Sequence, residues 1–258
     1  MIISKKDFID KVDFEDKNLV SNIYDKILLC SKINNVVYTD EFYPPNVWKT
    51  VENLSSNLPV RIYSSGVFNE SERRMLAFSP DEVWYYPIDL LKIENRSKFL
   101  SLRHRDYMGA IMSLGIKRHK LGDFILKDNI CYVGVCQSLS EYIINNLTAI
   151  GKNPCTVSKL DLFQENLPNY DFEDINIIVT SLRMDSIVAG LANLSRGKGE
   201  ELLQSGKVLL NYLTIKDKAK VIKPNSCITI RGLGKFKFIC EIGETNRGRI
   251  KALFKKFS

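Results

Sequence analysis

Residues 193–211, NLSRGKGEELLQSGKVLLN, decide the fold of the C-terminal part of this chain. Ser195 is a natural helix N-cap, because its hydroxyl can accept the exposed amide hydrogens of the first turn, and Gly206 can end that helix in the left-handed conformation. Before this stretch, LRMD at 182–185 opens an apolar pattern with helical spacing, and within it KVLLN at 207–211 is typical of a strand. The sequence here therefore predicts two short helices followed by a sheet.

The same end of the chain carries its positive charge. Residues 181–258 contain 16 lysines and arginines against 6 acidic residues, a net +10, whereas residues 1–180 contain 21 against 24, a net −3. An asymmetry of this kind indicates a polyanionic partner for the basic end. In CITIRGLGKFKF at 227–238, lysines alternate with phenylalanines, so one face of the strand is apolar and the other is cationic. A cationic strand face suits contact with phosphates.

Three motifs in this region resemble, in order and spacing, the S4-type RNA-binding module. They are the Arg-Met-Asp triplet at 183–185, the Ser-Arg pair at 195–196 and the Gly-x-Val-x-x-Asn strand entry at 206–211. In that module the basic helix residues and the adjoining strand loops contact structured RNA. Together with the cationic strand face, the resemblance implies RNA-binding by Arg183, Asp185, Ser195, Arg196, Lys198, Lys207, Arg231, Lys235 and Lys237.

Three details of this region allow two interpretations each. Asp185 either orients Arg183 or is a first-turn acid favoured by the helix dipole. Gly197 and Gly199 stand where the module usually has better helix formers, and we favour a frayed helix start that tolerates them over a closer approach of backbone amides to phosphate. The basic tail 245–258 either extends the RNA footprint or is a solvated end.

The preceding sequence predicts a helical region at 1–57, an α/β domain at 58–165 and a linker at 169–174. The patterns of apolar residues, caps and turn signals define its elements. We expect helices on the Leu19-Ile23-Ile27 stripe and at 47–54, a strand at 59–66, a helix at 69–78 capped by Asn69, strands at 83–94 and 98–102, a helix at 106–115 capped by Asp106, a hairpin at 124–135, a helix at 138–151 with a Ser138-Glu141 capping box, and strands at 154–160 and 175–181.

The segment HRDYMGAIMSLGIKRHKLGDFIL at 104–126 excludes several enzyme classes. Its His-Arg-Asp triplet is similar to that of protein kinases, but no catalytic Asn, DFG or Gly-rich nucleotide loop accompanies it. A pseudouridine synthase would follow its Asp with small residues and a Gly, and a methyltransferase would need a Gly-rich strand–helix turn. The basic cluster at 117–120 exceeds what a helix end needs. A second candidate RNA contact is therefore Arg105, Lys117, Arg118 and Lys120.

Cysteine and histidine usage predicts neither disulfides nor a metal site. The six cysteines have no CxxC spacing, and the chain has only two histidines. Cys131 and Cys136 flank an apolar run and are expected to be small core residues. No cofactor is implied. The chain lacks a run of about 20 apolar residues and starts with a polar, acidic segment, so we expect a cytoplasmic protein with no membrane partner.

Four separated blocks, in order, make most of the chain similar to the YlmH family of bacterial S4-domain proteins. The blocks are SGVFNESERRMLAF (65–78), HRDYMGAIMSLGIKRHKLGD (104–123), YIINNLTAIGK (142–152) and the S4 module. The resemblance implies an α+β protein with an N-terminal helical region (1–57), a central RRM-like α/β domain (58–165) and a C-terminal S4 domain (181–258). It also implies ribosome-associated quality control: binding of the large ribosomal subunit with obstructed peptidyl-tRNA, and support of alanine tailing.

The sequence therefore predicts a monomeric, non-enzymatic RNA-binding factor. Its expected partners are large-subunit ribosomal RNA, tRNA and the large ribosomal subunit, with a quality-control tailing factor as a further candidate. One alternative is an RNA-modifying enzyme that uses His104, Asp106 and His119 as acid and base. Another is a cell-division (septation) protein that docks through Trp84-Tyr85-Tyr86, although we expect these rings to be buried in the core.

Overall fold

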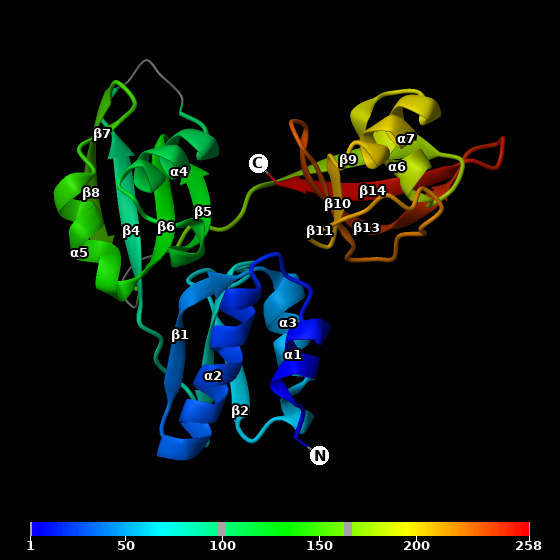
Figure 1. Cartoon of the computed structure of the whole chain (residues 1–258). Coiled ribbons are helices and arrows are strands. Elements are labelled where there is room, and N and C mark those ends of the chain that lie inside the picture. Colours follow the sequence, from blue (N-terminus) through cyan, green and yellow to red (C-terminus); the bar gives the residue numbers. More distant parts are fainter. Residues whose placement is uncertain (1, 98–101, 163–166, 258) are drawn as a thin grey trace. The chain divides into compact units, whose positions relative to one another are not determined.

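The computed structural model describes residues 2–97, 102–162 and 167–257. These fall into two compact units, Met1–Asn169 (unit 1) and Tyr170–Ser258 (unit 2). Both units combine helices with antiparallel sheets, which confirms the predicted α+β class (Figure 1). Within the described ranges, no helix is long and apolar enough to cross a membrane.

The first part of unit 1 packs three helices against a three-stranded sheet of order β1-β3-β2. Helix α2 begins after Asp16, whose carboxylate accepts the amides of Asn18 and Leu19. Its residues Ile23 and Ile27 are fully buried, as their spacing predicted. The elements are α1 (Lys5–Lys11), α2 (Lys17–Ile33), β1 (Val37–Tyr43), α3 (Pro45–Asn53), the 3-10 turn η1 (Ser55–Asn57), β2 (Arg61–Ser65) and β3 (Arg74–Ser79).

This small sheet corrects two predictions. The region 1–57 is not helical throughout, because Val37–Tyr43 forms strand β1. The helix predicted at 69–78 is wrong, since Arg74–Ser79 is the middle strand β3. Strand β3 is hydrogen-bonded to β1 on one edge and to β2 on the other, and every residue after Arg74 is buried. Pairing with segments distant in sequence therefore overrides the local helical pattern.

The second part of unit 1 is a five-stranded sheet of order β5-β6-β4-β8-β7, covered on one face by two helices. The hairpin predicted at 124–135 and the strand at 154–160 are confirmed, and Cys131 and Cys136 are buried as expected. The elements are β4 (Ile88–Asn95), α4 (His104–Ser113), the 3-10 turn η2 (Arg118–Lys120), β5 (Leu121–Lys127), β6 (Ile130–Cys136), α5 (Gln137–Asn146), β7 (Ala149–Ile150) and β8 (Asn153–Leu160).

Helix α5 is shorter than predicted. It begins at Gln137, so Ser138 lies inside the first turn and does not act as the N-cap. It ends at Asn146, which leaves Ile150 in strand β7, and Gly151 (φ +61°) turns the chain into β8. In the sequence, the apolar residues keep helical spacing beyond Asn146. They do so because Ile150 of β7 packs in the same core cluster as the apolar residues of α5.

The strand predicted at 83–94 is also shorter, because β4 starts only at Ile88, directly after Pro87. Proline lacks the amide hydrogen that a sheet position needs, which explains the late start. The strand predicted at 98–102 falls mainly on residues 98–101, which lie outside the described residues.

Unit 2 is a six-stranded sheet of order β11-β10-β12-β13-β14-β9 with two helices on one face. Strand β14 pairs with both β13 and β9 and so lies inside the sheet. The interpretation of the tail 245–258 as a solvated end is therefore wrong. The elements are β9 (Phe172–Val179), α6 (Met184–Ala192), α7 (Arg196–Gln204), β10 (Val208–Leu210), β11 (Leu213–Thr214), β12 (Cys227–Ile230), β13 (Gly234–Glu244) and β14 (Ile250–Phe257).

Helices α6 and α7 touch through their backbones. A Cβ atom on Gly199 would lie 2.9 Å from the carbonyl oxygen of Asp185 and 3.0 Å from the amide nitrogen of Ala189. A frayed helix start is therefore wrong for Gly199, which is buried against α6. Gly197 differs, because a Cβ atom there would meet no atom within 4 Å.

The ends of α7 follow the predicted signals. The Oγ of Ser195 accepts the amide of Lys198, and Gly206 (φ +68°) turns the chain toward β10. These local signals hold because the cap and the left-handed turn depend on neighbouring residues alone.

The two glycines of α7 provide a matched test of this packing. We expect Gly199→Ala to lower the free energy of unfolding by about 1–3 kcal/mol, because the new methyl group forces the helices apart. Gly197→Ala should leave it unchanged or raise it by up to about 1 kcal/mol, because alanine favours the helix and the position is open. Urea unfolding of both variants measures the difference. Equal effects of the two substitutions would contradict close contact at Gly199.

Candidate nucleic-acid interface

A buried carboxylate holds two arginines at the start of both helices of unit 2. The Asp185 side chain is only 3% exposed, and Arg183 and Arg196 pair with it at Nη2–Oδ2 distances of 3.2 and 2.8 Å. The Nε atoms of both arginines also donate to it. Arg183 precedes α6 and Arg196 opens α7, so the carboxylate ties the two helix starts together. We call these three residues the arginine clamp.

The electrostatics of the arginine clamp favour a charged Asp185. Burial by itself raises the pKa of the carboxyl, but hydrogen bonds from Arg196, Arg183 and the Ser186 amide outweigh burial and leave the pKa below its ordinary value. Of the two interpretations of Asp185, the structure supports orientation of the arginines. The guanidinium groups remain partly exposed, 37% for Arg183 and 55% for Arg196.

A lysine-rich loop lies against the arginine clamp. The amides of Met184 and Asp185 donate to the carbonyls of Lys220 and Lys218, and Arg183 forms a β-bridge with Val221. Sequence reasoning missed this loop, although the charge run KDKAKVIK at 216–223 was a visible signal. Its exposed cations are Lys216, Lys218, Lys220 and Lys223.

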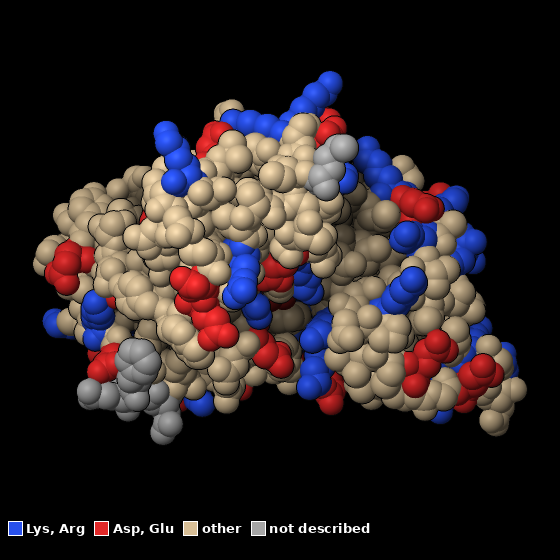
Figure 2. Space-filling view, turned by 90° about the horizontal axis from the view of Figure 1, so that it is seen from below, with Lys and Arg blue, Asp and Glu red and all other residues tan. Residues whose placement is uncertain are grey.

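The other predicted RNA-binding residues of unit 2 lie in three places: on α7, at the ends of two strands and on the outer face of the sheet. Lys198 lies in the first turn of α7 and is exposed, next to Arg196. Lys207 precedes β10 and Arg231 follows β12, and these strand ends meet, because the Arg231 amide donates to the Lys207 carbonyl. Figure 2 shows one face of the molecule, on which lysine and arginine side chains lie among acidic ones.

Lys235 and Lys237 do not share the face of the arginine clamp. Phe236 and Phe238 of the same strand are buried in the core together with residues of α6 and α7, as the alternation predicted. Because successive side chains of a strand point to opposite faces, the two lysines lie on the face away from the helices. The structure therefore brings together the clamp and Lys198, and separates both from Lys235 and Lys237.

The second candidate cluster, in unit 1, is largely engaged within the protein. The guanidinium of Arg118 donates to the carbonyls of Leu121 and Gly122, and burial, with the charge of Arg73, lowers its pKa to about 9. Lys120 bonds to the carboxylate of Glu41, 3.0 Å away. Lys117 is exposed, and so is Arg105, which lies 3.8 Å from the carboxylate of Asp106.

Two residues of the enzyme alternative, Asp106 and His104, have local structural roles. The carboxylate of Asp106 accepts the amide of Arg103 at 2.8 Å, so it caps α4 from the third helical position instead of from the N-cap. The ring of His104 packs on that of Phe124, with centroids 4.9 Å apart. Among the described residues, no group of three or more His, Cys, Asp or Glu side chains could hold a metal ion.

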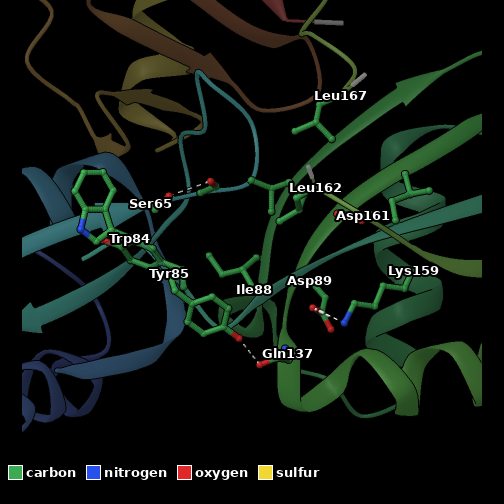
Figure 3. Close-up of a pocket in the computed structure, with 14 residues that line it drawn as sticks. Ser65, Trp84, Tyr85, Ile88, Asp89, Gln137, Lys159, Asp161, Leu162 and Leu167 are labelled. Atoms are coloured by element: carbon green, nitrogen blue, oxygen red, sulfur yellow. Dashed lines mark hydrogen bonds and ion pairs between the residues drawn. The ribbon is translucent and has the colours of Figure 1, made fainter. Parts of the chain in front are cut away.

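A pocket of about 650 Å³ lies beside the connection into β4 (Figure 3). Its wall includes Trp84 and Tyr85, which are 88% and 57% exposed, so the expected core burial of these rings is wrong. The hydroxyl of Tyr85 donates to Gln137 at the start of α5. On the far wall, Lys159 pairs with the buried Asp89, which also accepts the hydroxyl of Ser140.

Each of three comparisons with known proteins found similarity. A family model described as "Putative RNA-binding domain in YlmH" matches residues 81–164. The "Ribosome-associated protein quality control protein P2" of Bacillus subtilis (strain 168) is 26% identical over 220 residues, which is 84% of this chain and 86% of that protein. A solved structure, "Cell division protein ylmH from Streptococcus pneumoniae", is 22% identical with a TM-score of 0.49 and covers 59% of this chain and 95% of its own.

The family model covers strands β4 to β8, so the central sheet is similar to a putative RNA-binding domain. The same model and the B. subtilis relative bear out the resemblance to the YlmH family that the sequence blocks indicated.

The arginine clamp generates a stability prediction with a defined pH dependence. We expect Asp185→Asn to lower the free energy of unfolding at pH 7 by about 1–2 kcal/mol, because the charge-assisted bonds to both arginines weaken. The folded-state pKa of Asp185 is depressed, so its contribution is complete above the ordinary carboxyl pKa of about 4 and is lost as pH falls through the lower folded value. The difference between wild type and variant should therefore shrink on acidification.

Urea unfolding at a series of pH values measures this difference. Glu241→Gln is the matched control, because it removes one exposed carboxylate from the same unit. A difference between wild type and Asp185→Asn that stays constant down to acid pH would contradict the assignment to the clamp.

The basic cluster of unit 1 generates a second prediction. We expect Arg118→Gln to lower the free energy of unfolding by about 1–3 kcal/mol, because the Gly122 carbonyl loses its charged donor and the Leu121 carbonyl keeps only the one from Arg73. Lys117→Gln should leave stability unchanged, because its side chain is exposed. Urea unfolding compares the two variants. If Arg118→Gln were as stable as wild type, the internal hydrogen bonds of Arg118 would not stabilise the fold. The Arg118 guanidinium would then be free to contact RNA instead.

Proposed function

We propose that this chain is a non-enzymatic RNA-binding factor of ribosome-associated quality control. It binds the large ribosomal subunit that carries obstructed peptidyl-tRNA, and it contacts ribosomal RNA and tRNA through unit 2. The name of the B. subtilis relative and the RNA-binding family model support this proposal. The place of action is the cytoplasm, and the acting form is a monomer.

The observation that carries the proposal is the arginine clamp. Each arginine turns its Nε and Nη2 atoms toward Asp185, so the Nη1 side of each guanidinium fork faces away from the carboxylate. Guanidinium groups bind phosphate oxygens through paired, charge-assisted hydrogen bonds. Two forks fixed by one buried acid are therefore suited to neighbouring phosphates of a folded RNA.

The surrounding lysines extend the attraction without fixing its geometry. Lys198 and the loop that holds Lys220 are exposed beside the clamp, and they add long-range attraction to the phosphate backbone, whereas Lys218 of that loop pairs with Glu200. Contacts of this kind position an RNA and do not read its sequence. Such a surface can hold a tRNA against ribosomal RNA while a tailing factor adds alanine to the nascent chain.

The clamp arginines are the direct test. We expect the variant Arg183→Gln plus Arg196→Gln to bind large ribosomal subunits more weakly, because two phosphate contacts are lost. The slope of log K against log salt should become shallower by roughly 0.7–0.9 for each contact. Gradient sedimentation of tagged protein from lysate should show wild type with the large subunit and the variant at the top of the gradient.

The matched control is Lys32→Gln plus Arg61→Gln, which removes two exposed positive charges from unit 1. It should sediment as wild type does. If the clamp variant also sedimented with the large subunit, ribosome binding would not depend on the clamp, and the proposal would fail.

A further inference from the structure

The sheet of unit 2 presents aromatic rings and lysines on the face away from its helices. Phe254 of β14 is in the core with α6 and α7, so the alternate residues Lys255 and Phe257 lie on the outer face. In the register of the sheet, Phe257 stands beside Phe172 of β9, and on β13 Lys235 is its other neighbour. The row crosses three adjacent strands.

The rings on this face contact one another. The centroids of Phe172 and Phe257 are 5.1 Å apart, and Tyr170 lies 6.1 and 6.3 Å from them. All three side chains are only partly buried. The Nζ atom of Lys235 lies 4.2 Å from the Phe257 centroid and 5.8 Å from that of Tyr212. We call Tyr170, Phe172, Tyr212 and Phe257 the outer aromatic cluster.

Tyr212 reaches this cluster from a strained turn. Leu210 pairs with Leu213, so Asn211 and Tyr212 form a two-residue hairpin loop with φ values of +50° and +71°. Loops of this type favour Asn-Gly, because both central residues need a positive φ. A tyrosine in the glycine position is costly for the backbone, and outliers of this kind concentrate at binding sites. Tyr212 therefore occupies a turn position at which folding alone would favour glycine.

The charge around the rings is mainly positive. Lys235, Lys237 and Lys255 share the outer face, and Lys255 also lies 5.3 Å over the ring of Phe172. Asp174, opposite Lys255 in the register, is the acid on the same face. Exposed rings interleaved with lysines are the combination that holds unpaired nucleotides, since bases stack on the rings and cations hold the phosphates.

We infer that the outer aromatic cluster, with Lys235 and Lys255, binds unpaired nucleotides of RNA. Neighbouring strands lie about 4.8 Å apart, so the row from β13 to β9 spans roughly 10 Å. This site is distinct from the arginine clamp on the helix side. It rests on the proposed RNA-binding function and extends that function to a single-stranded segment next to a structured one.

The test compares two RNA probes on the full-length protein. One is a fluorescein-labelled oligouridylate of about ten nucleotides, within the site size of such surfaces. The other is a blunt RNA duplex. We expect Phe257→Leu and Tyr212→Gly each to weaken oligouridylate binding by about 5- to 100-fold, as loss of one stacked base does, without changing the salt dependence. Lys235→Gln should make the salt slope shallower by about 0.7. Duplex binding should stay unchanged in all three variants.

Folding and turn chemistry are controlled within the same chain. Tyr212→Gly creates the favoured Asn-Gly turn, so its melting temperature should equal or exceed that of wild type. Asn129→Gly makes the same change in the Asp128-Asn129 loop of unit 1, where both φ values are also positive, and should leave oligouridylate binding intact. Oligouridylate binding that survives both Phe257→Leu and Tyr212→Gly would overturn the inference and leave this face to a protein partner.

The two probes separate this inference from the proposed function. The Arg183→Gln plus Arg196→Gln variant should bind the duplex more weakly and keep oligouridylate binding. A wild-type protein that binds neither RNA would overturn both the proposed function and the inference. If the wild-type protein bound the duplex strongly, and Phe257→Leu and Tyr212→Gly did not weaken oligouridylate binding, the inference alone would be overturned.

Discussion

A single buried carboxylate organises the basic C-terminal unit of this protein. Asp185 takes hydrogen bonds from Arg183 and Arg196, so the starts of α6 and α7 meet at one point. The contact needs Gly199, because any larger residue would separate the two helix backbones. The same helix start carries backbone bonds to the lysine loop 216–223. The packing of α6 on α7, the charge of Asp185 and the orientation of the two guanidinium groups therefore depend on one another. The surface they form is already ordered in the protein without RNA.

The two faces of unit 2 suit different kinds of RNA contact. On the helix side, fixed guanidinium groups match phosphates whose spacing is set by a folded RNA. On the sheet side, rings and flexible lysines match nucleotides that are free of base pairing. Strand β14 makes the second face possible, since it carries both Lys255 and Phe257 between β13 and β9. The proposed function, in which unit 2 contacts ribosomal RNA and tRNA, has use for both faces.

Local signals in the sequence were reliable where the structure depends on neighbouring residues. The cap at Ser195, the turn at Gly206 and the hairpin at 124–135 all follow from short-range chemistry. Predictions were wrong for β3, because strands distant in sequence decide its state, and incomplete for the tail 245–258, which the sequence left as a solvated end or an RNA contact. The orientation of both arginines by Asp185 could be guessed from residue type, but only the fold brings Arg196 to it.

The most direct measurement is a double-mutant cycle on RNA affinity. It combines Asp185→Asn with the Arg183→Gln plus Arg196→Gln background and uses the RNA duplex as the ligand. If Asp185 acts by positioning the arginines, its substitution should weaken binding in the wild-type protein and have little further effect in that background. Equal losses in both backgrounds would contradict the arginine clamp, because Asp185 would then act on RNA binding independently of the two arginines.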